Sequence, residues 1–206
     1  MAKTITANGN AQIDTAQSKF GGGSYLGDGT GDYLSGNLGA DVIGTGDFTL
    51  DFWVRMASFK DYDTFFGTTR GANGFNVGTD ASKDLVFYID GLGRILETIG
   101  AFVNANQWYH IAFVRSSGTL KSYLDGVQQA SVANSTNLSN AAFRVGDLAD
   151  GGGESINGWI DELRLSVGTA RWTANFTPPN RFRRMIGGRL SRPDYFTKLF
   201  LHNDGI

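Results

Sequence analysis

The 206-residue sequence has no cysteine, only three prolines and only two histidines. The missing cysteines exclude disulfide bonds and thiolate metal sites, so packing alone has to hold the fold. No apolar run approaches the roughly 20 residues that a bilayer-spanning helix needs, and the amino terminus shows no secretory signal. We therefore expect a soluble protein without a membrane partner.

Residues that carry catalysis are also scarce. Only three glutamates are present, and a retaining glycosidase needs two carboxylates about 5 Å apart. Asp161 and Glu162 are adjacent, so on a strand they would point to opposite faces, and Glu162 is expected to pair with Arg164. His110 and His202 lie too far apart in the sequence to show metal-ligand spacing. We predict that the chain is not an enzyme.

Glycine, in contrast, is abundant, with 29 residues, which is about twice the usual share. The glycines follow no collagen period and therefore indicate many turns. Between them, apolar residues alternate with the two-residue period of strands, most clearly in residues 48–56. In that segment five side chains are predicted to face the core: Phe48, Leu50, Phe52, Val54 and Met56.

Further short apolar runs recur about every ten residues, which is typical of a two-sheet sandwich. In residues 158–166 the alternation places Trp159, Leu163 and Leu165 on one side. Residues 94–99 fit either a strand or one helical turn. The other predicted strands cover residues 24–26, 32–34, 65–67, 74–77, 85–90, 142–146 and 195–202.

Residues 108–130 predict a three-stranded meander at the centre of the fold. Two apolar runs, 108–115 and 119–125, precede the dipeptide Asp125-Gly126, which readily takes the positive φ angles of a tight turn, and a third extended run follows. A meander cannot bury its apolar face alone, so the rest of the chain is expected to supply a covering sheet. The predicted fold class is all-β.

Four segments together resemble the laminin-G-like branch of the concanavalin A-like jelly rolls: F-T-L-D-F-W-V-R (48–55), W-Y-H-I-A-F-V-R (108–115), Y-L-D-G-V (123–127) and G-W-I-D-E-L-R-L-S (158–166). The strings at 20–34 and 168–179 are similar to the version found in bacteriophage virion proteins. The resemblance implies a two-sheet antiparallel jelly-roll sandwich that binds glycans or proteins. Gly27 departs from the pattern, which usually has an aromatic residue there, so we expect a trimmed first sheet.

Domains of this kind usually open with a strand of the type L-L-L-H-x-D-G, which is missing here before T-A-N-G-N-A-Q (6–12). A matching string, K-L-F-L-H-N-D-G, occupies residues 198–205. Without the opening strand a sheet edge would stay unpaired. We predict a domain over residues 1–179 and an arm over residues 180–206, whose terminal strand completes the sandwich in the same copy or in a neighbour. The alternative is an arm that lies on the surface.

Charge is divided along the same boundary. Residues 181–206 carry six basic and two acidic side chains, a net charge of +4, whereas residues 1–180 have a net charge of −6. A positive tail on a negative body favours docking to the body, a neighbouring copy or an acidic partner over nucleic-acid binding. The predicted partner-binding residues are Arg181, Arg183, Arg184, Arg189, Arg192, Leu199 and Leu201.

Two kinds of small-ligand site are possible. Many domains of the resembled class carry a structural calcium ion, and Asp28, Asp32 and Asp161 are the candidate oxygen ligands, although Asp28 may simply shape its turn through backbone hydrogen bonds. For a glycan, rings on loops are the natural stacking surfaces, and the candidates are Tyr62 and Trp172. Burial in the core is the alternative for Trp172.

The resemblance and the arm together predict a non-enzymatic virion structural protein. It would be a capsid decoration or cement subunit that binds through its arm and sheet edges and assembles with its own copies, with a trimer favoured. The alternative function is a carbohydrate-binding adhesin at a phage tail or fibre. We expect the protein to be made in the host cytoplasm, to end in the virion and to bind no nucleic acid.

Overall fold

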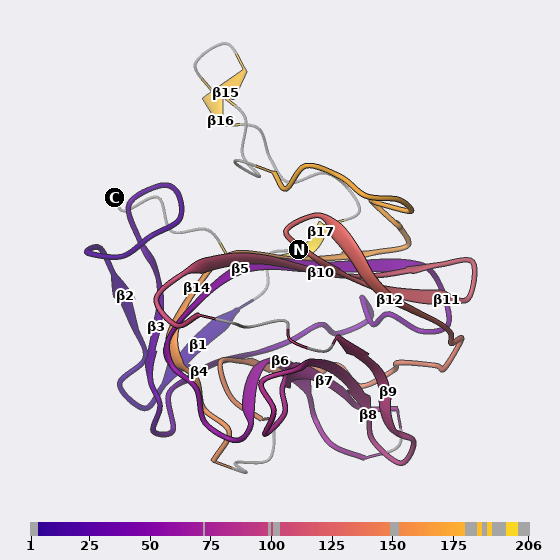
Figure 1. Ribbon diagram of the computed structural model, residues 1–206, viewed down its shortest axis with the longest axis horizontal. Helices are drawn as coiled ribbons and strands as arrows, with labels where there is room; N and C mark the ends of the chain where they lie inside the picture. Colours follow the sequence, from indigo (N-terminus) through magenta and orange to yellow (C-terminus); the bar gives the residue numbers. More distant parts are fainter. Residues whose placement is uncertain are drawn as a thin grey trace.

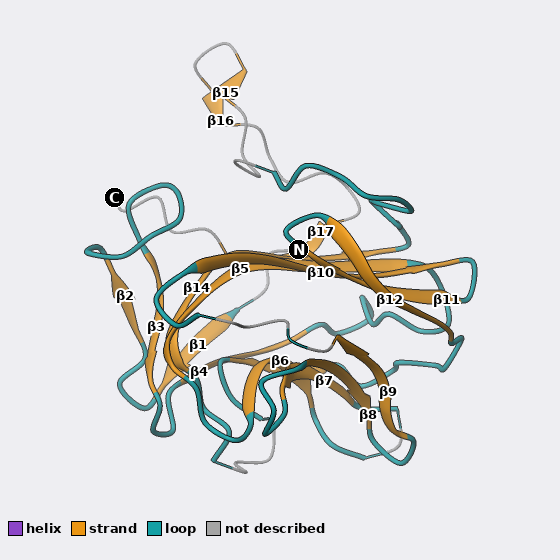
Figure 2. Cartoon of the chain, in the orientation of Figure 1, coloured by secondary structure: helices purple, strands orange, loops and turns teal. Residues whose placement is uncertain are grey.

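The computed structural model describes residues 4–71, 73–98, 100, 104–148 and 153–179, and the backbone of three later strands, β15 (Met185–Ile186), β16 (Arg189–Leu190) and β17 (Thr197–Leu201). These residues form strands and loops, and none of them is helical (Figure 2). Two antiparallel sheets lie face to face with the core between them (Figure 1). The predicted all-β sandwich of two antiparallel sheets is confirmed.

Within the described residues, no helix is long and apolar enough to span a bilayer.

The first sheet has seven strands. Four consecutive strands form a meander at one end of it, and three strands from distant parts of the chain extend it at the other end. The order is β1 (Ile5–Asn8), β4 (Tyr33–Asn37), β13 (Ala142–Val145), β6 (Asp63–Thr68), β7 (Phe75–Thr79), β8 (Leu85–Ile89) and β9 (Gly93–Thr98). Residues 94–99, which fitted a strand or a helical turn, thus belong mainly to a strand.

The second sheet has eight strands, and its two longest strands pair with each other at its centre. The terminal strand β17 joins it beside one of them. The order is β12 (Val127–Ala133), β11 (Thr119–Leu124), β10 (Trp108–Ser116), β5 (Phe48–Ser58), β14 (Asn157–Val167), β3 (Ser24–Asp28) and β2 (Gln12–Asp14), with β17 next to β14.

The core lies between the sheets and is rich in phenylalanine. All five apolar residues predicted to face inward from β5 are buried. Phe52 meets Phe65 of the seven-stranded sheet with 5.6 Å between ring centroids, and Phe48 meets Phe87 at 6.3 Å. Burying each such ring contributes about 1.5–3 kcal/mol. Contacts of this kind hold the two sheets together without any covalent link.

Strands β10, β11 and β12 form the predicted meander. Asp125 and Gly126 have φ angles of 48° and 80°, as the tight turn requires. The Asp125 carboxylate accepts a hydrogen bond from the backbone N–H of His110 at 2.8 Å, which ties the turn to β10. A Cβ on Gly126 would lie 1.9 Å from the carbonyl oxygen of Phe176, so glycine is also needed for space.

A bulge in β14 changes which side chains face the core. The pairing of β14 with β5 shifts within residues 161–164, and Glu162 has a φ of 53°. The extra residue reverses the alternation, so Leu163 and Leu165 point inward while Trp159 lies on the other face. There the Trp159 indole N–H donates to a carboxylate at 2.7 Å. The prediction that Trp159 shares a side with the two leucines is wrong because the bulge intervenes.

Residues 168–179, which we call the strap, cross the outer face of the eight-stranded sheet (Figure 1). The Trp172 and Phe176 rings stack at 3.9 Å with 6° between their planes and pack on Tyr123 of β11. The backbone N–H of Phe176 donates to the Gly126 carbonyl at 2.9 Å, and the Lys121 ammonium donates to a strap carbonyl at 2.8 Å. The strap therefore forms a second, smaller apolar cluster outside the main core.

The terminal strand β17 lies within the predicted strand 195–202 and pairs antiparallel with β14. Its register places Leu201 opposite Leu163, Leu199 opposite Leu165 and Thr197 opposite Ser166. The remaining arginines of the predicted arm, Arg181, Arg183, Arg184 and Arg192, lie outside the described residues, and for Arg189, Leu199 and Leu201 only the strand backbone is described.

Candidate functional site

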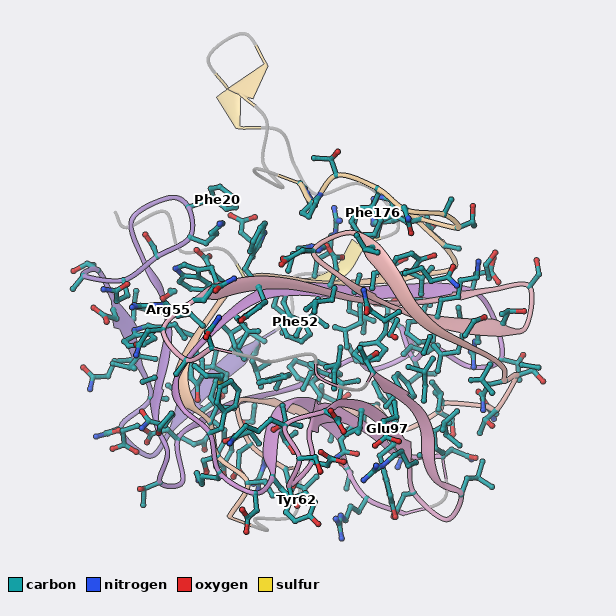
Figure 3. The ribbon with its side chains drawn as sticks, viewed as in Figure 1. Phe20, Phe52, Arg55, Tyr62, Glu97 and Phe176 are labelled. Atoms are coloured by element: carbon teal, nitrogen blue, oxygen red, sulfur yellow. The ribbon has the colours of Figure 1, made fainter. Side chains whose placement is uncertain are left out.

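A hollow of about 360 Å³ opens on the outer face of strands β6 to β9, on the side of the seven-stranded sheet that faces away from the core. Figure 3 shows Tyr62 on this side of the molecule and Phe176 of the strap beyond the opposite sheet. The volume falls in the range of small-ligand sites. Its lining combines two tyrosines, two arginines, three carboxylates and small polar residues.

Strand alternation and register bring the lining residues together. Phe75 on β7 and Phe87 on β8 point into the core, so the next residues, Asn76 and Tyr88, face outward. The pairing sets Asn76 opposite Tyr88 and Tyr88 opposite Arg94. A row of outward side chains from three strands therefore crosses the sheet along one side of the hollow.

Glycine at position 78 keeps the floor of the hollow low. The pairing of β6 with β7 is irregular at residues 64–66, which brings the two backbones close together. A Cβ on Gly78 would lie 2.0 Å from the carbonyl oxygen of Asp63. Gly78 therefore lines the hollow without a side chain, at a position where glycine permits the close approach of the two strands.

Tyr62 and Tyr88 are the exposed rings of the hollow. Tyr62 is 53% exposed and Tyr88 is 37% exposed. Neither hydroxyl forms a hydrogen bond with any residue that the structure describes. Their rings offer flat apolar faces, and their hydroxyls are available to a bound molecule.

Two further polar side chains of the hollow are available to a ligand. Arg70 and Asn76 make no side-chain hydrogen bond or ion pair within the described part of the chain. By contrast, Glu154 accepts a hydrogen bond from the Thr64 hydroxyl at 2.8 Å. The hollow thus contains a guanidinium and an amide whose donors and acceptor are not used by any residue that the structure describes.

Asp63 is the most buried carboxylate of the lining, with 1% exposure. One of its oxygens accepts the backbone N–H of Lys60 at 3.0 Å. Burial raises the pKa of Asp63 to about 6, although the Lys60 N–H, the Lys60 charge and the Thr79 hydroxyl oppose the rise, and Glu154 adds to it. At neutral pH the hollow therefore has an ionised carboxylate in its wall at some cost to folding.

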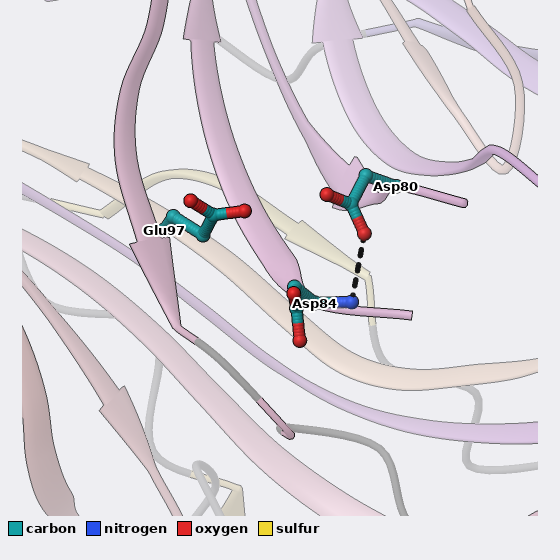
Figure 4. A group of neighbouring side chains, drawn as sticks. All are labelled: Asp80, Asp84 and Glu97. Carbon is teal, nitrogen blue, oxygen red and sulfur yellow. Dashed lines mark hydrogen bonds between the residues drawn. The ribbon is translucent and has the colours of Figure 1, made fainter. Parts of the chain in front are cut away.

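Asp80, Asp84 and Glu97 form an acidic group beside the hollow, with one oxygen of each lying within 4.8 Å of the others (Figure 4). The guanidinium of Arg94 pairs with Asp80 at 2.9 Å and also pairs with Glu97. Asp80 additionally accepts the backbone N–H of Asp84 at 3.0 Å, and Asp84 accepts the N–H of Gly100 at 2.6 Å.

The oxygen donors of this group suit a hard divalent cation, and one guanidinium compensates part of their negative charge. Arg94 supplies the positive charge that a metal would otherwise supply to Asp80 and Glu97. Arg94 would compete with a metal ion for the Asp80 and Glu97 oxygens that it contacts. The three carboxylates have the donor atoms to hold a metal ion, and Arg94 is the competing cation.

The calcium candidates from the sequence act as acceptors for backbone groups. Asp28 accepts the N–H of Thr30 at 2.8 Å, and Asp32 accepts the N–H of Asp28 at 3.0 Å. Asp161 accepts the N–H of Lys19 at 2.8 Å. The Asp28 bond matches the alternative in which that residue shapes its turn, and calcium binding by Asp28, Asp32 and Asp161 stays a prediction.

The two glycan candidates lie on opposite sheets. Tyr62 lines the hollow, whereas Trp172 is half-buried in the strap, 6.0 Å from the ring of His110. Sequence reasoning offered Asn76 only as the polar neighbour of Phe75, and it did not identify Tyr88 or the acidic group as site residues. Alternation in residues 75–79 and 85–89 marks the outward positions, but only the register between strands shows which of them meet.

Comparison with known proteins bears first on the fold. The profile of the laminin G type 3 family, described as the concanavalin A-like lectin/glucanases superfamily, matches residues 28–173, which is more than half of the chain. A search of curated protein sequences found no match.

Solved structures share the fold at low sequence identity. Domain 4 of the extracellular arabinanase AbnA from Geobacillus stearothermophilus, in complex with arabinotriose, has a TM-score of 0.61 at 20% identity, covering 82% of this chain and 83% of that one. A putative carbohydrate-binding protein from Bacteroides ovatus has a TM-score of 0.59 at 17% identity, covering 100% and 53%. A mutant of the NanB sialidase from Streptococcus pneumoniae has a TM-score of 0.59 at 18% identity, covering 75% and 27%. At these identities the likeness shows the fold alone.

Proposed function

Because this chain belongs to the concanavalin A-like lectin/glucanase superfamily, we propose that it is a non-catalytic carbohydrate-binding domain that takes a neutral glycan in the hollow of the seven-stranded sheet. The observation that carries the proposal is that two exposed tyrosines line the hollow together with Arg70 and Asn76, whose side chains make no hydrogen bond or ion pair with the described residues. The binding of arabinotriose by a structural neighbour supports it.

The chemistry of the hollow suits a sugar. One face of a pyranose or furanose ring is formed by C–H groups and stacks on an aromatic ring, while its hydroxyls need planar donors and acceptors in fixed places. Tyr62 and Tyr88 supply rings, and Asn76 and Arg70 supply the fixed polar groups. The lining holds three carboxylates and two arginines, and one of these arginines is paired with Asp80. Because the hollow has no excess of positive charge, a neutral glycan is favoured over an acidic one.

A non-catalytic role is proposed from the partners of the carboxylates. Glu154 is bonded to Thr64, Asp80 is paired with Arg94, and Asp63 is buried against the Lys60 N–H. Each carboxylate is thus held by the fold rather than directed at a bound substrate. Incubation with the bound glycan should release no new reducing ends, and release of reducing ends would overturn this part of the proposal.

The first experiment is a glycan array with the purified full chain, followed by calorimetry on the best neutral ligand. Tyr62→Ala and Tyr88→Ala should each weaken binding about tenfold, because each removes a stacking face. Val127→Ala is the matched control, since Val127 is 51% exposed, about as much as Tyr62, but lies on β12 of the other sheet.

Three outcomes decide the proposal. Binding of a neutral glycan that both tyrosine variants weaken and the Val127 variant does not would support it. Failure to bind any glycan would overturn the function, and binding that survives both tyrosine substitutions would overturn the site. A strong preference for acidic glycans would overturn the assignment to a neutral ligand.

The other function predicted from the sequence, a capsid decoration subunit of a virion, stays a prediction. It draws on the positive arm and on the phage-like strings, which neither the fold nor the structural neighbours test. Immunogold labelling of particles from a source lysate, with antibody to residues 1–180, is the measurement that decides it. Regular label over the heads would support decoration, whereas label confined to tail tips would favour an adhesin with the proposed glycan site.

A further inference from the structure

Two different strands pair with the same edge of β14. β3 pairs with residues 157–160 of β14, and β17 pairs with residues 163–166. On its other edge β14 pairs with β5 along nearly its whole length. We call the edge at residues 163–166 the slot, because β3 ends before it and a separate strand occupies it.

The slot lies at the core rather than at the margin of the fold. Leu163 and Leu165, at its centre, have no exposed surface. If no strand occupied the slot, the backbone groups of this edge would lose their hydrogen-bond partners beside a buried apolar face. The domain therefore depends on a strand in the slot, whichever copy of the chain supplies it.

We propose that the slot is an interface between copies of this chain, in which residues 197–201 of one copy pair with β14 of another. The pairing within one chain shows that this segment fits the slot. The same backbone register is available to an identical segment from a neighbour, so exchange replaces each intramolecular contact by an identical intermolecular one.

The connection to the terminal strand is long enough for exchange. Seventeen residues, 180–196, join the end of the strap to Thr197, and when extended they span up to about 58 Å. Within them β15 and β16 pair with each other and with no other described strand (Figure 1). An isolated two-stranded hairpin is marginal in water, so a neighbouring copy offers it a packing surface.

Charge favours contact between the arm of one copy and the body of the next. The arm carries a net charge of +4 in residues 181–206, and residues 1–180 carry −6. This attraction acts between copies as well as within one, and salt weakens it. Exchange through the eight-stranded sheet also leaves the hollow of the other sheet uncovered.

Engineered disulfides test the exchange directly, because the chain has no cysteine of its own. Ser166 and Thr197 are paired residues, and directly opposite antiparallel positions have the Cα spacing that a disulfide needs. Ser166→Cys and Thr197→Cys chains, carrying tags of different mass, are co-expressed and oxidised gently. Only a strand supplied by another copy can join the two different chains.

We expect co-expression to give a disulfide-linked heterodimer that a reductant separates. Its yield should be at least tenfold above the yield of disulfide-linked homodimers when either single variant is expressed alone. If co-expression gives no heterodimer while the double variant Ser166→Cys/Thr197→Cys closes within one chain, exchange does not occur and the proposal is wrong. If no disulfide forms in either arrangement, the pairing of β17 with β14 is itself absent, and the proposal is equally wrong.

A second measurement needs no cysteine. Sedimentation of the full chain should give a mass of at least two chains that falls as salt is raised, and a chain lacking residues 193–206 should sediment as a monomer or lose solubility. A monomeric full chain, or a truncated chain with the same mass and the same unfolding midpoint as the parent, would overturn the inference. Both results are independent of glycan binding.

Discussion

The outer faces of the two sheets carry similar kinds of side chain, but one face is covered and the other is open. Each carries aromatic rings beside arginines and carboxylates. Over the eight-stranded sheet the strap covers these groups, so His110 and Asp51 have no exposed surface. Over the seven-stranded sheet no described segment covers them, and Tyr62 is 53% exposed. The same residue types thus form a second apolar cluster on one side and an open hollow on the other.

This difference shows that coverage decides whether such a group is structural or available for binding. On the covered side the polar groups bind one another: Arg164 donates two hydrogen bonds to Asp51, at 3.1 and 3.0 Å, and its guanidinium lies 5.7 Å from the Trp172 ring. On the open side Arg70 and Asn76 have no partner among the described residues. Substitutions on the two sides should therefore separate stability from binding.

The largest effect is expected from Asp51→Ala on the covered side. Asp51 has no exposed surface and holds both Arg164 and, at 3.6 Å, the ring of His110. Its removal takes away two partly buried hydrogen bonds and a negative charge from the nearly buried guanidinium of Arg164, which costs about 3–5 kcal/mol. Urea unfolding should show this loss, and a change below about 1 kcal/mol would mean that the pair is already exposed to water.

Asp63→Asn should change how stability depends on pH. The folded pKa of about 6 lies above the ordinary value of 3.8, so the neutral carboxyl favours the folded state. That contribution is complete below about pH 4 and is lost as pH rises through 6, a change of about 3 kcal/mol. Because asparagine stays neutral, the parent and the variant should have similar free energies of unfolding at pH 4. Their free energies of unfolding should separate as the pH rises to 7, because only the parent loses this contribution. Parallel curves would contradict the prediction.

Trp172→Ala should destabilise the protein by about 2 kcal/mol, because the ring is half-buried and stacks on Phe176. Glycan affinity should stay unchanged, since the strap lies on the other sheet. A loss of affinity without loss of stability would place the binding surface on the strap instead of the hollow.

The smallest effect on stability is expected from Tyr62→Ala, at less than about 0.5 kcal/mol, because an exposed side chain loses little packing. The unfolding midpoint should match that of the parent chain even though glycan binding falls. A drop in stability as large as that expected for Trp172→Ala would show that the ring supports the fold.

The sequence predicts the sandwich well because each strand carries its own alternation. In β5 the five inward residues follow the two-residue period, and Asp125-Gly126 specifies its turn. The sequence assigns Trp159 to the wrong face because the bulge at Glu162 adds one residue to the strand, and no local sequence pattern predicts that bulge. A positive φ at a buried glutamate depends on the tertiary environment of β14 rather than on propensity.

The site is less predictable because it depends on register between strands. Tyr62 lies between two aspartates and is identified as an exposed ring from the sequence alone. Tyr88 and Asn76 are single outward residues in apolar strands, and their proximity follows only from the pairing of β7 with β8. Asp80 and Asp84 are four residues apart, but Glu97 joins them only through the β8–β9 hairpin.

In the hollow, Asn76 and Tyr88 project outward from strands whose other faces form the core, and Tyr62 and Arg70 lie in the loops on either side of β6. Such positions can be replaced without repacking the interior, so Tyr62, Arg70, Asn76 and Tyr88 define a surface suited to randomisation. The absence of cysteine allows the same chain to fold in reducing and oxidising compartments alike. The domain is therefore a natural starting scaffold for selecting new binding specificities, with its proposed recognition residues on one sheet and its proposed strand-exchange edge on the other.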